Sequence, residues 1–544
     1  MSGIGEILKA VGDLGTFQKR LVLFSMLPCL SLAFHQFCQL FMVPDLPHYC
    51  NTSWIRAVGP NLTEEEQLNL TLPRDADGAY EQCSMYSPVD WDLGSIVAYG
   101  LNATEKCSSG WVYPSAQQPS LLTEFDLVCD SKDLNDISQS VYMLGLFLGA
   151  MIFGPLSDRI GRRPVLLISI FLQGFFGLGI AFVPHFYVYM AFRCVVGASV
   201  SGITMTLLIH TRLLITHCCF AAGQMILAGL SYGIRNWRLL EIAGSAPIFA
   251  LFFFTWVLPE SARWLVTKGK IEEAKKVLQK AASINKRTIP PDLLEQVPKP
   301  VWGDARPQRP ASEWFVNSIV YYGLSLNVTN FGLDIYLTQL AFGAVEIPAR
   351  VGCIFLLQWF GRRKSQAGTL LLSGLSLLFP PSDEPMAITV LATIGKFAAS
   401  ASFSCSYVYS AELFPTIIRQ SGVGLCSMAA RVAGIIAPLI RLLEQYHRAV
   451  PMAVFGSAPV LGGLLCFLLP ETRGAELVDD TRGGRPTEQV SPRAASSCSR
   501  GTAGPEKGPW ALHELLVGAA LGAYVDGRQG VGCPIANGEE GKGW

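Results

Sequence analysis

The stretch from Gly154 to Arg163, which reads GPLSDRIGRR, constrains the fold of this chain more than any other. It separates two apolar runs, at about residues 137–153 and 164–183, that each approach the ~20 residues of a membrane-spanning helix. Three arginines in the stretch indicate the cytosolic side, because short cytosolic loops are rich in Lys and Arg. We therefore expect a tight cytosolic turn between two spanning helices.

The composition of the whole chain indicates a polytopic membrane protein. Of the 544 residues, 50% are hydrophobic, and several apolar runs reach the length of about 18 residues that a span requires. The formal net charge is zero, so overall charge does not indicate nucleic acid as a partner. The lipid bilayer is the expected environment.

A polar segment after the first apolar run has the features of an extracellular loop. Four of the 15 cysteines lie in it: Cys50, Cys83, Cys107 and Cys129. The segment also carries four N-glycosylation sequons, at Asn51, Asn61, Asn69 and Asn102. Together these indicate an oxidising, glycosylating compartment. We expect a disulfide-linked, glycosylated loop, and four cysteines allow three pairings.

The apolar runs predict twelve spans and an all-α fold. The expected order is a cytosolic amino terminus (1–20), span 1 (21–43), the extracellular loop (44–135), spans 2–6 (136–258), a cytosolic loop (259–313), spans 7–12 (314–470) and a disordered cytosolic tail (471–544). No small-residue cleavage site follows the first run, so we expect the amino terminus to be retained. Span 7 has only about thirteen apolar residues from Trp314, too few for a regular helix to cross ~30 Å of hydrocarbon.

The chain also repeats itself at an offset of about 200 residues. Gly161-Arg162-Arg163 recurs as Gly361-Arg362-Arg363, and the Pro-Glu pair at 259–260 recurs at 470–471. Arg193 in span 4 has Lys396 in span 10 as its counterpart. Such repeats predict two six-helix halves with a substrate site between them near the midplane.

Two arginines lie where a membrane protein rarely carries charge. Arg350 is eleven residues before Gly361, about 16 Å from the cytosolic end of its helix, and Arg431 reaches a similar depth in span 11. Each costs about 2.5 to 3.5 kcal/mol at the centre of a spanning helix, so both need compensation. One account is a water-filled cavity in which they bind a carboxylate. The other is an ion pair, for which Glu346 is the candidate partner of Arg350; no acid lies near Arg431 in span 11.

Aromatic residues could supply the rest of a site for an organic ion. Tyr322 lies in span 7, and Phe403 and Tyr407 lie one turn apart in span 10, on the same stripe as Lys396. A stripe of this kind more often serves helix packing than ligand binding, so both interpretations stay open. We expect these four residues, with Arg350 and Arg431, to form the substrate site.

Charged residues at the cytosolic ends are expected to bias a conformational switch. An acid that faces a helix amino terminus or an arginine can hold one state and release it in the other. The candidates are Asp158 with Arg159 and Arg162, Glu260 with Arg263, and Glu412 with Arg419. Ordinary solvated loop charges are the alternative.

These motifs resemble a known family. The pattern G-x-L-S-D-R-x-G-R-R is similar to the signature loop of the major facilitator superfamily, and the long four-cysteine loop, residues 259–264, residues 409–420 and Arg431 resemble solute carrier family 22, over about residues 5–475. The resemblance implies the major facilitator fold, and basic residues at 350 and 431 look like those of the anion-transporting branch. Residues 236–238, 321–324 and 332–336 look most like the branch that exchanges urate and nicotinate.

The chain departs from the family pattern in two places. The loop between spans 4 and 5, residues 208–216, has no acid where the family usually has one, and the region is about ten residues short. Residues 303–310 are polar where the family has an apolar helix. These departures put activity in doubt more than fold.

We expect a secondary transporter that exchanges small organic anions, such as urate or nicotinate-like monocarboxylates, across the plasma membrane by alternating access, with no cofactor. Its partners would be the substrate and a counter-anion. The alternatives are a family member that no longer transports and acts as a receptor or scaffold, and a carrier of cations or zwitterions, which the absence of a midplane acid disfavours. We do not expect an enzyme, because no metal-ligand spacing or nucleophile motif is evident.

Overall fold

The structure is a computed structural model. It describes residues 15–44, 46–75, 78–114, 118–210, 213–255, 258–287, 311–328, 334–378, 385–413, 419–447 and 449–472. The predicted disordered tail lies outside the described residues, except for residues 471 and 472. Residues 303–310, at which the chain departs from the family pattern, also lie outside them.

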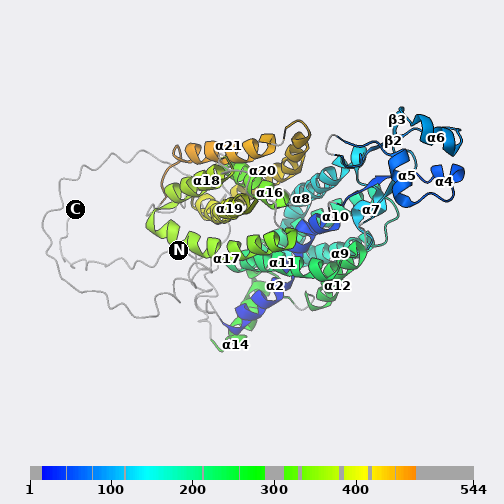
Figure 1. The fold of residues 1–544 in the computed structure, drawn as a ribbon. Coiled ribbons are helices and arrows are strands. Elements are labelled where there is room, and N and C mark those ends of the chain that lie inside the picture. Colours follow the sequence, from blue (N-terminus) through cyan, green and yellow to red (C-terminus); the bar gives the residue numbers. More distant parts are fainter. Residues whose placement is uncertain are drawn as a thin grey trace, which may run out of the picture. The chain divides into compact units, whose positions relative to one another are not determined.

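Long apolar helices make up most of the described chain (Figure 1). The amino half contains α2 (Thr16–Phe37), α3 (Gln39–Met42), α8 (Asp133–Ile160), α9 (Arg162–Ile180), α10 (Phe186–His210), α11 (Leu213–Gly233) and α12 (Trp237–Thr255). The carboxyl half contains α16 (Ala311–Leu326), α17 (Ile335–Trp359), α18 (Arg362–Leu378), α19 (Pro385–Leu413), α20 (Arg419–Arg441), the 3₁₀ helix η3 (Leu442–Gln445) and α21 (Ala449–Cys466). Among the described helices, eight are long and apolar enough to cross a membrane.

The predicted turn at residues 154–163 is wrong in its extent. Helix α8 continues through Gly154 and Pro155 to Ile160, and only Gly161, with φ +110°, separates it from α9. A glycine inside a helix costs only about 1 kcal/mol, which the packing of a 28-residue helix easily offsets. Gly161 is the position that needs glycine, because its backbone is left-handed.

Two other predicted bounds also differ. Helix α2 begins at Thr16 rather than at residue 21, and α16 begins at Ala311, three residues before the predicted start of span 7. The polar residues at the two starts, such as Lys19 and Glu313, join the first helical turns because the apolar runs behind them are already helical. Even so, α16 has only 16 residues.

The helices pack as two halves. In the amino half α8 packs on α10 and α9 on α12, and in the carboxyl half α18 packs on α21 and α16 on α20. The largest buried apolar cluster lies mainly in the amino half and includes Tyr321 of α16, and the second lies in the carboxyl half. The halves meet where α8 contacts α20 and where α11 contacts α17.

Between α3 and α8 the chain forms a small separate layer, which we call the lobe. Its elements are β1 (Tyr49–Cys50), α4 (Ile55–Val58), α5 (Glu64–Thr71), β2 (Ser84–Tyr86), α6 (Leu93–Tyr99), β3 (Thr104–Lys106), β4 (Trp111–Val112), α7 (Leu121–Phe125) and η1 (Cys129–Ser131). Strand β1 pairs with β4 and β2 with β3, both antiparallel.

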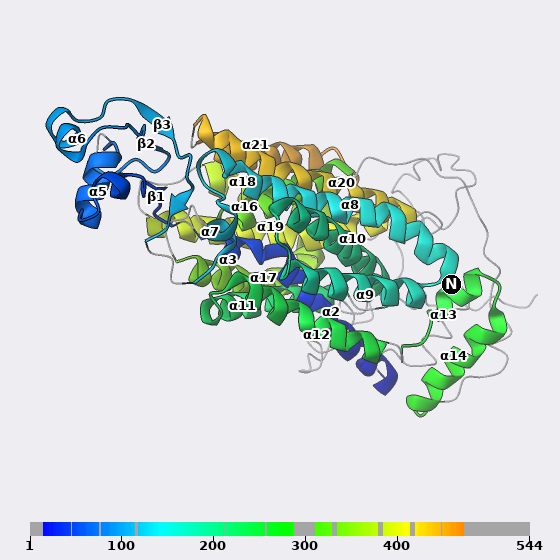
Figure 2. The same ribbon diagram turned by 90° about the vertical axis from the view of Figure 1, so that its right-hand side faces the viewer.

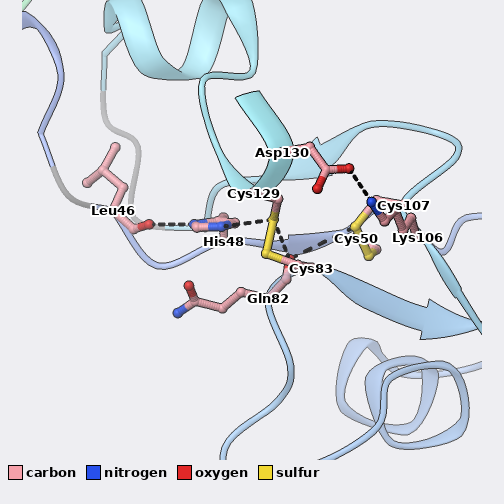
Figure 3. The surroundings of a disulfide bond; sticks show 9 residues. All are labelled: Leu46, His48, Cys50, Gln82, Cys83, Lys106, Cys107, Cys129 and Asp130. Atoms are coloured by element: carbon pink, nitrogen blue, oxygen red, sulfur yellow. Dashed lines mark hydrogen bonds and ion pairs between the residues drawn. A yellow bond between two sulfur atoms is a disulfide. The ribbon is translucent and has the colours of Figure 1, made fainter. Parts of the chain in front are cut away.

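Two disulfides join the strands of the lobe. Of the three pairings that the sequence allows, the structure has Cys50–Cys107 and Cys83–Cys129. The carbonyl oxygen of Gln82 lies 3.9 Å from the Cys107 sulfur and 3.7 Å from the Cys129 sulfur, so the two bridges are neighbours (Figure 3). They compensate for the small apolar core of the lobe.

Two further helices, α13 (Ala262–Thr267) and α14 (Ile271–Ile284), follow α12. They lie at the end of the long helices opposite the lobe (Figure 2). We call these two ends the lobe end and the far end.

Candidate functional site

A buried carboxylate organises the centre of the carboxyl half. Glu346 of α17 pairs with Arg350 one turn later, Oε2 to Nη2 3.0 Å, and with Lys396 of α19, Oε1 to Nζ 2.9 Å. It also accepts hydrogen bonds from the Tyr321 hydroxyl at 2.6 Å and from the Gln224 amide at 3.3 Å. All of these side chains are buried.

This network answers the question left open for Arg350. Its ion pair with Glu346 is the structural alternative, and Arg350 also donates to Ser404 Oγ at 3.4 Å. Lys396 is fully buried, donates to Ser325 Oγ and lies 3.4 Å from the centre of the Tyr321 ring. Both cations therefore act within the carboxyl half, and one carboxylate for two cations leaves the network with a net positive charge.

Arg431 of α20 is placed differently. Its side chain is partly exposed, and its Nη1 donates to the backbone oxygen of Leu146 in α8 at 3.4 Å. Its buried Nε has no hydrogen-bond partner within the described chain, and no described carboxylate forms an ion pair with it. Tyr322 and Tyr407 are close enough to interact with it electrostatically. Arg431 is thus a cation at the contact between the halves for which the described residues supply no counter-charge.

Further aromatic rings lie next to Tyr407, one of the tyrosines near this arginine. The Phe403 ring lies 5.5 Å from Tyr321 and 6.0 Å from Tyr407, between ring centres. The predicted residues Tyr322, Phe403 and Tyr407 are partly exposed, so they combine ring packing with an accessible face. These contacts show the packing that the stripe was expected to provide, and its contact with a ligand stays a prediction.

Sequence reasoning missed two neighbours of these rings. The ring centres of Trp314 and Tyr407 are 4.3 Å apart, and the Trp314 indole N–H donates to Ser410 Oγ at 2.7 Å. His217 of α11 lies 5.5 Å from Tyr407, across the contact between the halves. The sequence offered a signal for Trp314, because it is a tryptophan at the first apolar position of span 7. It offered none for His217 beyond the place of this histidine in an apolar run.

A second buried cluster occupies the amino half. Arg193 of α10 donates to the Gln139 side chain at 3.0 Å and lies 4.8 Å from the centre of the Tyr142 ring. His35 of α2 and Glu241 of α12 contact each other, Nδ1 to Oε1 3.4 Å, and both are almost fully buried. Sequence reasoning missed this cluster, although Glu241 is an acid inside a predicted span.

Neither of two possible metal-ligand groups in the described residues is suited to a metal ion. His35, Cys38 and Glu241 lie close together, but the Arg193 guanidinium is 3.4 Å from the Cys38 sulfur and would repel a cation. In the other group, His48 with Cys83 and Cys129, the two sulfurs form a disulfide.

At the far end of the amino half, carboxylates hold the start of α9. Glu260 accepts hydrogen bonds from the backbone N–H groups of Arg162 at 2.9 Å and of Arg163 at 3.2 Å. Asp158 pairs with the Arg162 guanidinium at 2.6 Å, whereas Arg159 is exposed. A carboxylate at a helix start is favourable because it meets unpaired N–H groups and the positive end of the helix dipole.

The carboxyl half repeats this arrangement with one change. Glu471 accepts from the N–H groups of Arg362 at 2.8 Å and Arg363 at 3.2 Å. The Arg362 guanidinium pairs with Glu412 of α19 at 2.8 Å, where Arg162 pairs with Asp158 of the preceding helix α8. Glu471 was not among the predicted switch residues. The side chains of Arg263 and Arg419, predicted partners of Glu260 and Glu412, lie outside the described residues.

Comparisons with known proteins identify the family. The model for "Sugar (and other) transporter" matches residues 91–296 and 315–480. Human solute carrier family 22 member 13 is 47% identical, over 88% of this chain and 92% of that protein. Rabbit (Oryctolagus cuniculus) solute carrier family 22 member 6 is 35% identical, over 89% of this chain and 96% of that protein.

Solved structures show the same fold. The xylose transporter XylE from E. coli, in a partially occluded inward open conformation, superposes with a TM-score of 0.57 at 15% identity, over 85% of this chain and all of that chain. Its inward open conformation superposes with a TM-score of 0.55. With two packed helical halves, the chain has the major facilitator fold, and it belongs to solute carrier family 22, a family of multi-pass membrane transporters of small molecules.

Proposed function

We propose that the protein exchanges small organic anions across the plasma membrane by alternating access. The observation that carries this proposal is Arg431, a partly exposed cation without a described counter-charge, which lies between the halves and beside Tyr322 and Tyr407. An unpaired charge in a spanning helix is costly, and a bound carboxylate would remove the cost. The positive charge of the Glu346 network reinforces a preference for anions.

The substrate would be a flat aromatic or heteroaromatic monocarboxylate, or a similar anion such as urate. Its carboxylate would form charge-assisted hydrogen bonds with Arg431. Its ring would lie against Tyr322, Phe403 and Tyr407, since offset and edge-to-face arrangements of rings are favourable. Arg350 and Lys396 would act indirectly, through the field of the network.

We place the far end in the cytosol and the lobe outside the cell. The far end carries Arg162 and Arg163, Arg362 to Lys364 and the lysines of α14, as the positive-inside rule requires. The lobe carries the disulfides and all four sequons, and Asn61, Asn69 and Asn102 are exposed. In this orientation α2 begins in the cytosol.

The acids of the far end would set the conformational equilibrium. Glu260 and Glu471 hold the starts of α9 and α18, and Glu412 ties α18 to α19. Movement of one half against the other would weaken these contacts in one state and restore them in the other. No nucleotide site is part of this proposal, so a counter-anion gradient would drive transport.

The decisive experiment measures uptake of labelled nicotinate and urate by cells that display the protein, with surface amounts equalised by biotinylation. We expect uptake by the unchanged protein and its loss in Arg431→Ala. Arg74→Ala, the same substitution at an exposed arginine of the lobe, is the control and should keep uptake. Uptake that persists in Arg431→Ala would contradict the assigned role.

A second candidate is a family member that does not transport. Two features favour this candidate. Residues 208–216, between spans 4 and 5, contain no acid, and α16 has only 16 residues. Correctly displayed protein that moves neither anion, nor a wider panel of anions and cations, would support this candidate, and the lobe would then be its functional part.

A further inference from the structure

The start of α2 and the end of α14 are joined, although they are 268 residues apart in the chain. The backbone N–H of Phe17 donates to Asn285 Oδ1 at 2.9 Å, and Asn285 Nδ2 donates to Gln18 Oε1 at 2.8 Å. Asn285 thus satisfies one of the N–H groups that a helix start leaves unpaired. Gly15 permits the contact, because a Cβ at this position would overlap the Asn285 side chain.

Apolar packing holds the same junction. Phe17 packs on a small cluster in which Leu278, Ala281 and Ala282 of α14 are buried. This side of α14 faces α2, which turns the charged residues of the helix outward. The end of α14 is therefore fixed to the first turn of a spanning helix rather than loosely tethered.

Five exposed basic side chains surround the contact, and we call them the basic junction: Lys19, Arg20, Lys280, Lys286 and Arg287. None of the five forms an ion pair with another described residue. The two acids of α14 are already used, since Glu272 pairs with Lys275 and Glu273 with Lys270. The junction is consequently a concentrated positive charge for which the described part of the chain supplies no ion-pair partner.

The contact also fixes the level of this charge relative to the bilayer. Apolar sequence begins at Leu21, so Lys19 and Arg20 stand at the edge of the hydrocarbon. Asn285 bonds to residues 17 and 18, and this holds Lys286 and Arg287 at the same level. Lys280 is five residues before Asn285, about 7.5 Å along the helix. With the chain from Leu21 onward in the hydrocarbon, this arrangement would put all five charges at the depth of lipid headgroups.

We propose that the basic junction binds the anionic headgroups of phospholipids in the cytosolic leaflet and so fastens α14 to the membrane. Clusters of Lys and Arg next to a spanning helix attract anionic lipids, and the attraction falls off within a Debye length, about 8 Å at physiological salt. The charges here are within such a distance of the headgroups. The cytosolic assignment rests on the proposed orientation; the binding itself does not.

The test uses the full chain in nanodiscs of phosphatidylcholine with about 20% phosphatidylserine, the anionic lipid whose surface charge attracts such clusters. Both leaflets of a nanodisc face solution, so neither orientation nor transport affects the result. After mild detergent extraction, the lipids that remain with the protein are quantified. We expect phosphatidylserine to be enriched about threefold over the bulk ratio. The variant with all five residues changed to Gln should fall to the bulk ratio.

Two further variants keep the test decisive. Lys132→Gln with Lys364→Gln removes two exposed lysines elsewhere and should keep the enrichment. Asn285→Ala keeps every charge but removes the two hydrogen bonds that join α14 to α2, and it should lower the enrichment measurably. Full enrichment in the five-residue variant or in Asn285→Ala, or an equal loss in the control, would overturn the proposal. If the five-residue variant shows no cooperative thermal unfolding in phosphatidylcholine nanodiscs, it is not folded. The phosphatidylserine enrichment of Asn285→Ala then decides the test on its own.

Discussion

At the scale of single residues, Glu346 provides the counter-charge for two buried cations of the carboxyl half. It is fully buried and pairs with both Arg350 and Lys396. The Glu346 carboxylate serves as the counter-charge of both cations, whereas Arg431 forms an ion pair with none of the described carboxylates. A ligand carboxylate would therefore bind Arg431 at a lower desolvation cost than it would meet inside the Glu346 network.

Changing Glu346 to Gln should destabilise the protein strongly. The substitution leaves Arg350 and Lys396 buried beside each other without a counter-charge, and loss of one partner of a buried pair costs about 3–5 kcal/mol. The melting temperature in detergent should fall clearly, whereas Glu65→Gln, the same change at an exposed residue of the lobe, should leave it unchanged. Adding Lys396→Met to Glu346→Gln should recover part of the loss, because it removes one stranded cation. A melting temperature that Glu346→Gln leaves unchanged would refute the network's structural role.

The sequence allowed only part of this network to be predicted. The spacing of Glu346 and Arg350 on one helix made their ion pair a stated alternative, because residues four apart face each other. Lys396 comes from another helix, and no periodicity relates the rotation of α19 to that of α17. Its stripe was predicted, but the direction in which Lys396 points depends on tertiary packing.

At the scale of elements, an acid of the lobe holds the lobe to the helices. Glu124 of α7 accepts from the Trp237 indole N–H at 2.7 Å and forms an ion pair with Arg238 at the start of α12. Arg238 also donates to the backbone oxygens of Ala181 and Val183, at the end of α9. One arginine thus joins α7, α9 and α12.

This contact should make stability depend on pH in the acid range. Burial opposes ionisation of Glu124, but hydrogen bonds from Arg238 and Trp237 outweigh it, so its pKa lies below the ordinary 4.5. For a carboxyl group with a lowered pKa, the stabilisation is complete above its unfolded pKa and is lost as pH falls through its folded pKa. The difference in melting temperature between the unchanged protein and Glu124→Gln should be constant above about pH 5 and shrink below it.

The control for this dependence is Glu65→Gln, at an exposed acid of the same lobe. Its melting temperature should follow that of the unchanged protein at every pH. A difference for Glu124→Gln that grew on acidification would have the wrong sign and would refute the ionised contact.

The sequence repeat predicted corresponding loops at the far ends of the halves, and the structure places corresponding carboxylates there. Glu260 and Glu471 cap α9 and α18 in the same way. Glu471 could have been found from the recurrence of Pro-Glu at 259–260 and 470–471. The extent of α8 could not have been predicted in this way. A sequence of glycine, proline and charges is typical of a turn, and only packing keeps residues 154–160 helical.

At the scale of the whole molecule, the two halves meet at the lobe end. Asp136 of α8 pairs with Arg441 of α20 at 3.4 Å, and the Ser140 hydroxyl donates to the Ile435 backbone oxygen at 3.1 Å. On the other line of contact, Arg235 after α11 donates to the Tyr336 hydroxyl of α17 at 2.6 Å. The proposed alternating access would require these contacts to break when the lobe end opens.

Two halves were predictable from the repeat, but the contacts that close them were not. Asp136 falls at the predicted border between loop and span, where acids are ordinary. Arg441 lies 305 residues away, at the end of a different half, so their pairing depends on how the halves dock. Sequence periodicity carries no information on that docking.

We expect Asp136→Asn to shift the protein towards the state that is open at the lobe end. The pair is mostly but not fully buried, so its loss should cost about 1 kcal/mol and change the population of that state about fivefold. In a Tyr322→Cys background, an impermeant thiol reagent added outside should label the new cysteine several times faster after Asp136→Asn, relative to protein with Tyr322 intact. Asp133→Asn, the same change at an exposed acid one turn earlier on α8, is the matched control and should not alter the rate. Exchanging the charges, Asp136→Arg with Arg441→Asp, should restore slow labelling. Equal labelling rates in the Tyr322→Cys protein and in all three of its variants would mean that this ion pair does not hold the lobe end closed.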